Sequence, residues 1–199
     1  MSRLHRLYFN RLAPVWANKS RHEQVAEAVC GFVKKGENVL DAGAGTGYLT
    51  EKLGEWCAPG IVLAVDLSER MLQEARKRIT QKGVLYLCSD VSCTAVASNA
   101  FDKIVCYSSF PHFDRPIEAL HEFLRVLKPG GKILVFHNCC SRRLNQFHAA
   151  LPEVVSFDKL PKAEQLMELV RFVGFTNVVG RERPDLYWVE AEKPIRRSS

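Results

Sequence analysis

Several features that would move this chain out of the class of ordinary globular domains are absent from its sequence. No apolar run approaches the roughly 20 residues that a membrane-spanning helix needs. The basic N-terminal residues 1–6 are not followed by the apolar segment of an export signal. The seven cysteines are an odd number and include no Cys-x-x-Cys pair. We therefore expect no membrane span, no assigned metal ligands, and free thiols in a reducing cytoplasm.

Internal repeats and low-complexity linkers are also missing, which leaves one continuous domain over residues 1–199. A chain of this length is large enough to bury a substantial core. Its net charge of +6 permits an RNA or another anionic partner without requiring one. Residues 193–199 hold three of the positive charges and are expected to form a solvated tail. The sequence does not determine the oligomeric state.

Short apolar runs alternate with segments of helical periodicity along the chain. The predicted strands cover residues 38–42, 61–65, 84–88, 101–107, 133–136, 176–180 and 186–191. Helices are predicted over 3–12 with an end at Pro14, after the capping box Ser20-x-x-Glu23, over 48–56, after the caps Ser68 and Asp114, and over 166–173. This order predicts an α/β fold with a doubly wound, mostly parallel seven-stranded sheet and an antiparallel edge hairpin.

The most informative stretch follows the first predicted strand, where Asp41 precedes three glycines spaced two apart, Gly43, Gly45 and Gly47. Glycine permits a positive φ and a close approach of ligand to backbone, and the following helix offers unpaired N–H groups. A dinucleotide-binding turn has its third glycine three residues after the second, so the spacing disfavours an NAD-dependent oxidoreductase. An acid at the mouth of the turn suits a ligand with a cationic end.

The stretch Asp41-Ala42-Gly43-Ala44-Gly45-Thr46-Gly47 resembles the first motif of class I S-adenosylmethionine-dependent methyltransferases. Residues 125–132 also closely resemble this family, and most of the chain fits it. The resemblance implies a Rossmann-like methyltransferase fold and S-adenosylmethionine as cofactor. It assigns the cofactor to the acid and glycines of the first motif, to Asp66 and Leu67 at the ribose, to Asp90 and Val91 at the adenine, and to Tyr107 near the reactive end.

Asp66 is also informative by position, since it ends the second predicted strand 19 residues after Gly47. A carboxylate there accepts hydrogen bonds from both hydroxyls of a ribose, as in NAD sites. The position therefore indicates a ribose-containing cofactor but does not separate the two kinds.

Two segments are expected to cover the acceptor. Residues 9–16 resemble the N-terminal segment of quinone-type methyltransferases, which folds over the cofactor as a lid, so residues 1–19 are predicted to be a lid. Residues 137–161 follow the fifth predicted strand and are expected to lie on the substrate side. Tyr8, Trp16, Arg142 and His148 are the candidate substrate contacts in these segments. A helix that simply docks on the core is an equally consistent interpretation of the first segment.

Three histidines, His112, His137 and His148, are expected near the reactive end of the cofactor. Because neighbouring strands lie about 4.8 Å apart, His112 and His137 are predicted to share one pocket. Either one is a candidate general base for a phenol, enol or amine acceptor, and a metal bound by the cluster is the alternative. Cys139 and Cys140 beside them raise the further option of a metal or metalloid acceptor.

The residues at the tip of the fourth predicted strand narrow the chemical class of the methyl acceptor. The chain has Ser108-Ser109-Phe110-Pro111 in place of the Asn/Asp-Pro-Pro-Tyr/Phe tip of base-amine methyltransferases, and it has no aromatic, basic RNA motif. The sequence therefore favours a small-molecule acceptor. An RNA or protein acceptor and a catalytically silent, cofactor-binding partner subunit remain alternatives.

Overall fold

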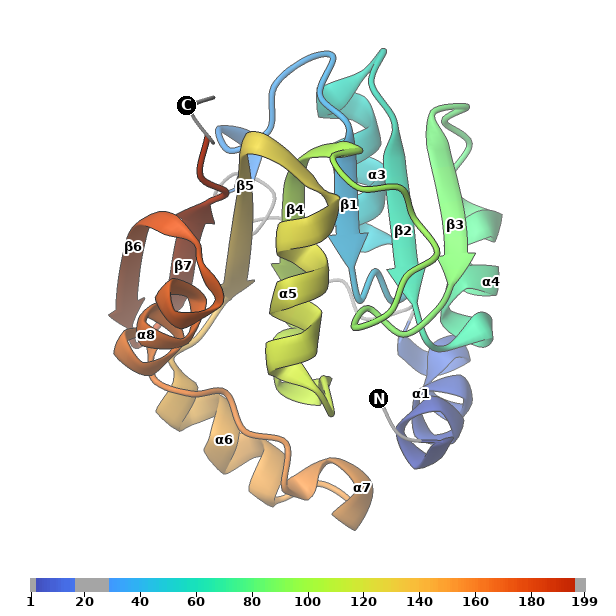
Figure 1. Cartoon of the computed structure of the whole chain (residues 1–199). Helices are drawn as coiled ribbons and strands as arrows, with labels where there is room; N and C mark the ends of the chain where they lie inside the picture. Colours follow the sequence, from blue (N-terminus) through green and yellow to red (C-terminus); the bar gives the residue numbers. More distant parts are fainter. Residues whose placement is uncertain (1–2, 17–28, 196–199) are drawn as a thin grey trace.

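The computed structural model describes residues 3–16 and 29–195, which form one sheet with helices on both faces (Figure 1). The predicted capping box at Ser20 and Glu23 lies outside the described residues. The strands are β1 (Val39–Ala42), β2 (Val62–Asp66), β3 (Val84–Cys88), β4 (Phe101–Tyr107), β5 (Leu127–His137), β6 (Thr176–Arg183) and β7 (Leu186–Glu192). The helices are α1 (Arg3–Trp16), α3 (Tyr48–Cys57), α4 (Glu69–Arg78), the 3-10 turn η1 (Phe110–His112), α5 (Pro116–Val126), α6 (Ser141–Ala149), α7 (Glu153–Ser156) and α8 (Ala163–Val173).

The seven strands lie in the order β3-β2-β1-β4-β5-β7-β6. Strands β1 to β5 pair in parallel, and β7 is inserted antiparallel between β5 and β6. The predicted fold class, including the edge hairpin, is confirmed. Because the order reverses between β1 and β4, a crevice opens at the carboxyl ends of these two strands.

The two faces of the sheet have separate apolar cores, with α5 and α8 on the front face in Figure 1 and α3 and α4 behind. Phe123 of α5 and Leu166 of α8 are fully buried on the first face, and Leu53 of α3 and Ala75 of α4 on the second. Strands covered on both sides need apolar residues on both sides, which explains the unbroken apolar runs in the sequence. None of the helices in the described ranges is long and apolar enough to cross a membrane.

Helices α1, α6 and α7 lie beyond the carboxyl ends of the parallel strands, where they cover the crevice (Figure 1). Helix α1 packs against α4 and α7. It also continues through Pro14 to Trp16, so the predicted end at this proline is wrong. A proline so close to the helix end removes a single backbone hydrogen bond, and we attribute the extra residues to packing on α4 and α7.

The two predicted helix caps have opposite outcomes. Ser68 caps α4 as predicted, since its hydroxyl accepts the Met71 N–H at 3.1 Å. Asp114 does not cap α5, which begins after Arg115 without any side-chain cap. The Asp114 carboxylate instead lies 3.8 Å from Nδ1 of His5 in α1. A contact with a distant segment has therefore replaced the local one.

Candidate active site

A cavity of about 640 Å³ opens at the carboxyl ends of the central strands, beneath α1 and α6. This volume lies within the roughly 300–1,000 Å³ of typical small-molecule sites. Its floor is formed by the glycine-rich loop after β1, and its cover by side chains of α1 and α6. The cavity therefore has two halves, which differ in how they are built.

The three glycines of the loop have different structural roles. All have positive φ, at 79° for Gly43, 55° for Gly45 and 79° for Gly47. A Cβ on Gly43 would lie 2.3 Å from Cβ of Ser109, and one on Gly47 would lie 2.7 Å from Cδ1 of Ile79. A Cβ on Gly45 would meet no atom within 4 Å, and Gly45 lines the cavity. Two glycines are thus required by packing, and the third leaves its backbone open to a ligand.

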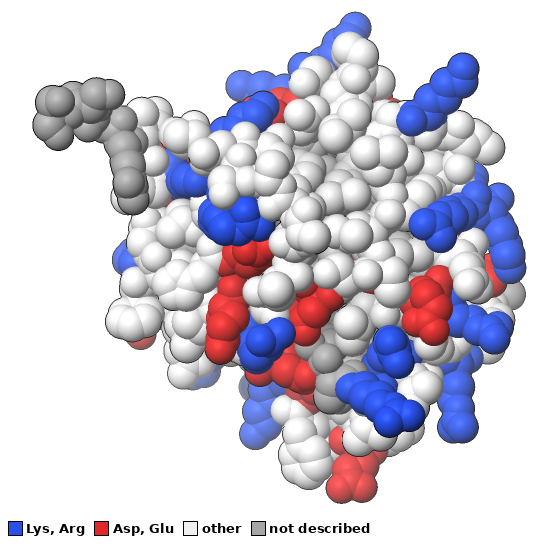
Figure 2. All heavy atoms as spheres, turned by 45° about the vertical axis from the view of Figure 1, so that its right-hand side comes forward, with Lys and Arg blue, Asp and Glu red and all other residues white. Residues whose placement is uncertain are grey.

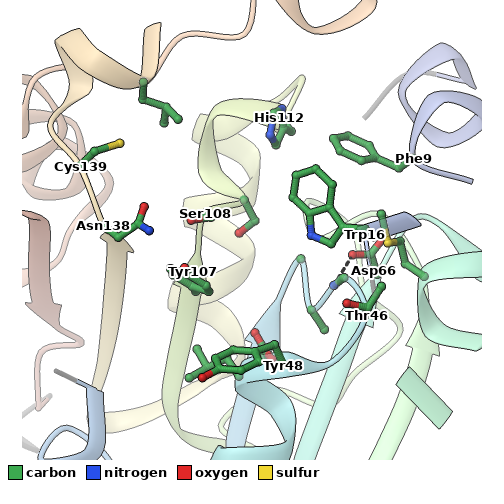
Figure 3. A pocket seen from close by; sticks show the side chains of 18 of the residues that line it. Phe9, Trp16, Thr46, Tyr48, Asp66, Tyr107, Ser108, His112, Asn138 and Cys139 are labelled. Carbon is green, nitrogen blue, oxygen red and sulfur yellow. Dashed lines mark hydrogen bonds between the residues drawn. The ribbon is translucent and has the colours of Figure 1, made fainter. Parts of the chain in front are cut away.

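Asp66 holds the loop in place from the end of β2. One of its carboxylate oxygens accepts the Gly45 N–H at 2.8 Å, and the other accepts the Ser68 N–H at 2.8 Å (Figure 3). The residue is buried, and burial raises its pKa against the opposing effect of these two bonds. Asp66 lines the cavity, and its predicted bonds to a ribose stay a prediction.

Asp41 lies deeper and is 1% exposed, with its carboxylate accepting the Thr50 hydroxyl at 2.6 Å. Burial raises the pKa of this carboxyl to about 7, the Thr50 bond opposes the rise, and the charge of Asp66 adds to it. A cation that entered the cavity would favour the ionised form and lower this pKa. The sequence-based expectation that this carboxyl meets the cationic end of a ligand stays a prediction.

The other predicted cofactor residues are divided between the cavity and its surroundings. Tyr107 lines the cavity close to Tyr48, and burial raises the pKa of Tyr107 to about 12 (Figure 3). Leu67, Asp90 and Val91 are not part of the lining. The Asp90 carboxylate accepts the backbone N–H and the hydroxyl of Ser92, at 2.9 and 2.8 Å. Val91 is buried in the apolar core.

The cover is mainly apolar. Trp16 lies between Phe9 and His112 on one side and Asp66 on the other, and Asn138 and Cys139 face them across the cavity (Figure 3). Of the predicted substrate contacts, Trp16 and His148 line the cavity, while Tyr8 and Arg142 do not. Phe9 and Arg143, one residue away from each, line it instead. Both predicted segments contribute side chains to the lining, and helical phase decides which neighbour faces inward.

His112 and His137 do not share the cavity. His112 lines it, whereas His137 is 1% exposed and packs edge-on against Tyr187 at a ring distance of 5.6 Å. Burial lowers the pKa of His137 to about 3, with smaller contributions from His112 and His148. Among the described residues, neither ring nitrogen of His137 has a hydrogen-bond partner. Although β4 and β5 are neighbours, successive side chains of a strand point to opposite faces.

Asp158, a residue that the sequence analysis did not single out, contacts three histidines: His5, His112 and His148. Its Oδ2 lies 2.6 Å from Nδ1 of His112, and both of its carboxylate oxygens lie 3.0 Å from Nε2 of His5. His148 donates from Nδ1 to the Asp158 backbone carbonyl at 2.8 Å. No local pattern marks Asp158 or His5, because their contact joins residues 153 positions apart.

The sequence of this chain is similar to those of known proteins. It matches a family model described as a methyltransferase domain over residues 40–135. It is 32% identical over 145 residues to the ubiquinone/menaquinone biosynthesis C-methyltransferase UbiE of Idiomarina loihiensis, and 34% over 143 residues to that of Yersinia pestis. Each match covers 69% of this chain but 56% of the relative, so the chain spans little more than half the length of these curated relatives.

Solved structures support the fold. An S-adenosylmethionine-dependent methyltransferase from Aquifex aeolicus has a TM-score of 0.76 at 21% identity, covering 92% of this chain and 98% of that chain. A chain from the complex between the Haloferax volcanii Trm112 methyltransferase activator and the putative methyltransferase has a TM-score of 0.81 at 20% identity, covering 94% and 97%. The sheet order, the glycine-rich loop at the end of β1 and these matches place the chain in the class I S-adenosylmethionine-dependent methyltransferases, which use S-adenosylmethionine as cofactor.

Proposed function

We propose that this chain transfers the methyl group of S-adenosylmethionine to a small-molecule acceptor held between the cofactor and the α1–α6 cover. The observation that carries the proposal is the position of the apolar half of the cavity, between Trp16 and His112 and next to the loop that would hold the cofactor. S-adenosylmethionine supplies a methyl group on a cationic sulfur. The buried Asp41 carboxyl and the open backbone at Gly45 fit such a cationic, ribose-containing ligand.

Methyl transfer of this kind is an in-line displacement, in which the protein contributes mainly position. The acceptor atom would approach from the cover side, where Phe9, Trp16 and Phe147 give the lining an apolar surface. The same side chains would hold a flat, apolar ring. UbiE relatives are named for methylation in quinone biosynthesis, which supports a quinone-like ring as the acceptor class.

His112 is the proposed general base. Its Nδ1 donates to Asp158 at 2.6 Å, which leaves Nε2 as the nitrogen that can accept a proton. The edge-on contact with Phe9, at a ring distance of 5.0 Å, restricts the orientation of the imidazole. A phenol or enol acceptor would lose its proton to Nε2 as the new bond to carbon or oxygen forms. Arg143, also in the lining, is available for an anionic substituent of the acceptor.

An RNA or protein acceptor is the second candidate, because the net charge is +6. The face over β3 and α4 argues against it, since Lys and Arg side chains are spread around this face with Asp and Glu among them (Figure 2). A polymer would also have to reach a cavity that lies beneath α1 and α6. All seven cysteines are free thiols, which supports the proposed cytoplasmic location.

The deciding experiment uses methyl-labelled S-adenosylmethionine, the purified protein and a fractionated extract of the source cells. Label in a solvent-soluble fraction that resists nuclease and protease would support the proposal and allow the acceptor to be identified. Label in a nuclease- or protease-sensitive polymer would overturn it in favour of the second candidate. Tight cofactor binding without transfer into any fraction would instead indicate a catalytically silent subunit.

A further inference from the structure

The side chains of His5, His112 and Asp158 form a largely buried cluster at the edge of the cavity, with His5 the most buried of the three. Each offers one nitrogen or oxygen ligand atom, and these atoms all lie within 4.8 Å of one another. We propose that the cluster is a binding site for one divalent transition-metal ion of the zinc class. The ligands would be Nε2 of His5, Nδ1 of His112 and the Asp158 carboxylate.

The ligand atoms already converge on one point. Asp158 Oδ2 lies 2.6 Å from His112 Nδ1 and 3.0 Å from His5 Nε2, so both imidazoles aim a nitrogen at the same carboxylate. The three residues come from α1, from η1 and from the loop after α7, and their side chains are only 11 to 13% exposed. To admit an ion, the two imidazoles and the carboxylate would have to move apart slightly, but none of them would have to turn to a new direction.

The surroundings also resemble those of a metal site. Metal-bound histidines commonly donate their second N–H to a carboxylate, which fixes the ring and its tautomer. Asp114 Oδ1 lies 3.8 Å from Nδ1 of His5, the nitrogen opposite the proposed ligand atom. The loop that carries Asp158 is held by the His148 bond to its backbone carbonyl at 2.8 Å. The loop that carries Asp158 is therefore fixed by a hydrogen bond, and a second carboxylate lies near the outer nitrogen of His5, at a distance longer than a hydrogen bond.

The donor set indicates which ion would bind. Two neutral imidazoles and one carboxylate suit zinc and its neighbours, whereas magnesium and calcium prefer oxygen ligands alone. Three protein ligands leave a fourth tetrahedral position for water or another small ligand. Binding requires no change of oxidation state, and each histidine only moves its ring proton to the nitrogen opposite the ion.

The consequence for catalysis follows from this change of tautomer, and this consequence alone rests on the proposed function. With the ion on Nδ1, His112 carries its proton on Nε2 and has no nitrogen left to accept one. The ion would also tie α1 to η1, because His5 and His112 belong to these two elements. Zinc is therefore expected to inhibit methyl transfer by occupying the base.

The test compares the stoichiometry of zinc binding between chelator-treated variants by calorimetry, because the seven cysteines provide background sites. Wild type is expected to bind one more ion per chain than His5→Ala and Asp158→Asn. The control is His121→Ala, an exposed histidine of α5 outside the cluster, which should match wild type. With Co²⁺ as probe, the difference spectrum should show d–d absorption without a thiolate charge-transfer band. Equal stoichiometry in all four proteins would overturn the site and indicate a purely hydrogen-bonded cluster.

Thermal stability gives a second readout that does not depend on turnover. At a 100-fold excess of zinc over Kd, the midpoint of unfolding should rise by about 5 °C or more in wild type and not in His5→Gln. Circular dichroism without metal would establish that the variant is folded, and a rise of the same size in His5→Gln would count against the site. A protein that binds zinc but transfers no methyl group even when it is free of metal would overturn only the proposed function, and a protein that transfers methyl groups but does not bind zinc would overturn only the metal site.

Discussion

The two halves of the cavity are built in different ways. The floor is a continuous stretch from Asp41 to Thr50, whose own side chains and backbone make much of its structure. The cover depends on contacts between distant segments: Asp158 contacts His112 of the lining, 46 positions away, and His5 of α1, 153 positions away. A short motif therefore specifies most of the floor, which Asp66 of β2 completes, whereas the cover exists only after the whole chain has folded.

The halves also differ in electrostatics. In the floor, burial raises the pKa of Asp41 to about 7 and the charge of Asp66 adds to the rise, while no cationic side chain among the described residues is a cause that lowers it. In the cover, the pKa of Asp158 is lowered, since hydrogen bonds and charge interactions with His112 and His5 outweigh partial burial. The floor thus lacks a positive charge that a ligand can supply, while the carboxylate of the cover is already paired within the chain.

The largest effect is expected from the cover. His112→Ala should lower kcat about 100- to 10,000-fold, the range typical for the loss of a general base. Its dissociation constant for S-adenosylhomocysteine should stay within a factor of about three of wild type, because the floor is untouched. Single-turnover kinetics and calorimetry measure the two quantities. Unchanged turnover would remove His112 from the chemistry, and an equal loss of cofactor binding would make it structural.

Within the floor, Gly43→Ala is expected to lower the free energy of unfolding by about 3 kcal/mol. The new Cβ would lie 2.3 Å from Cβ of Ser109, on a backbone with φ of 79°. Gly45→Ala, which meets no atom within 4 Å, serves as the matched control and should cost about 1 kcal/mol. Urea denaturation measures both, and equal losses in the two variants would contradict the separate roles of these glycines.

Asp41→Asn should stabilise the fold at pH 8 by about 2 kcal/mol while weakening cofactor binding. A carboxyl whose pKa is raised from 3.8 to about 7 keeps its proton longer in the folded state. Its contribution to stability therefore falls as the pH rises from about 4 to 7 and is constant above that. Unfolding measured at pH 5 and pH 8 should show this fall in wild type and a smaller one in Asp41→Asn. An identical pH dependence would rule out Asp41 as its source.

The same carboxyl predicts the pH dependence of binding. Between pH 6 and pH 8 the affinity for S-adenosylmethionine should rise about tenfold, because the ionised fraction of a group with a pKa of about 7 increases by that factor. Calorimetry on wild type and Asp41→Asn separates this titration from others. A variant that keeps the full pH dependence would show that another group is responsible.

The smallest effect concerns the two neighbouring arginines of α6. Arg143 lines the cavity and Arg142 does not, although the sequence favoured Arg142. Arg143→Ala should raise the KM for an anionic acceptor about fivefold, by analogy with other partly exposed charge contacts, and Arg142→Ala should leave it unchanged. The reverse order would show that the helix presents a different face to the acceptor.

The sequence predicts the elements of the floor better than those of the cover. The bounds of β3 and β4 agree with prediction, because the apolar side chains of Val84–Cys88 and of residues 104–107 mark these strands in the sequence. Helix α1 shows where this reasoning stops, since Leu4 and Leu7 are 62% and 47% exposed while His5 is 9% exposed. Its inner face contacts Asp158 as well as apolar side chains. Hydrophobic periodicity does not predict that the His5 imidazole is buried, because its partner is a carboxylate far away in the sequence.

The sequence by itself determined the family, the order of strands and helices, and the acidic, glycine-rich floor of the site. Each of these rests on interactions between residues close in the chain, or on apolar runs, which become buried whichever segment packs against them. Only the tertiary structure decided that His137 lies in the core, that Phe9 and Arg143 face the cavity, and that Asp158 joins His5 to His112. These depend on which strand face or helix phase meets which distant segment, and only the packed chain fixes that choice.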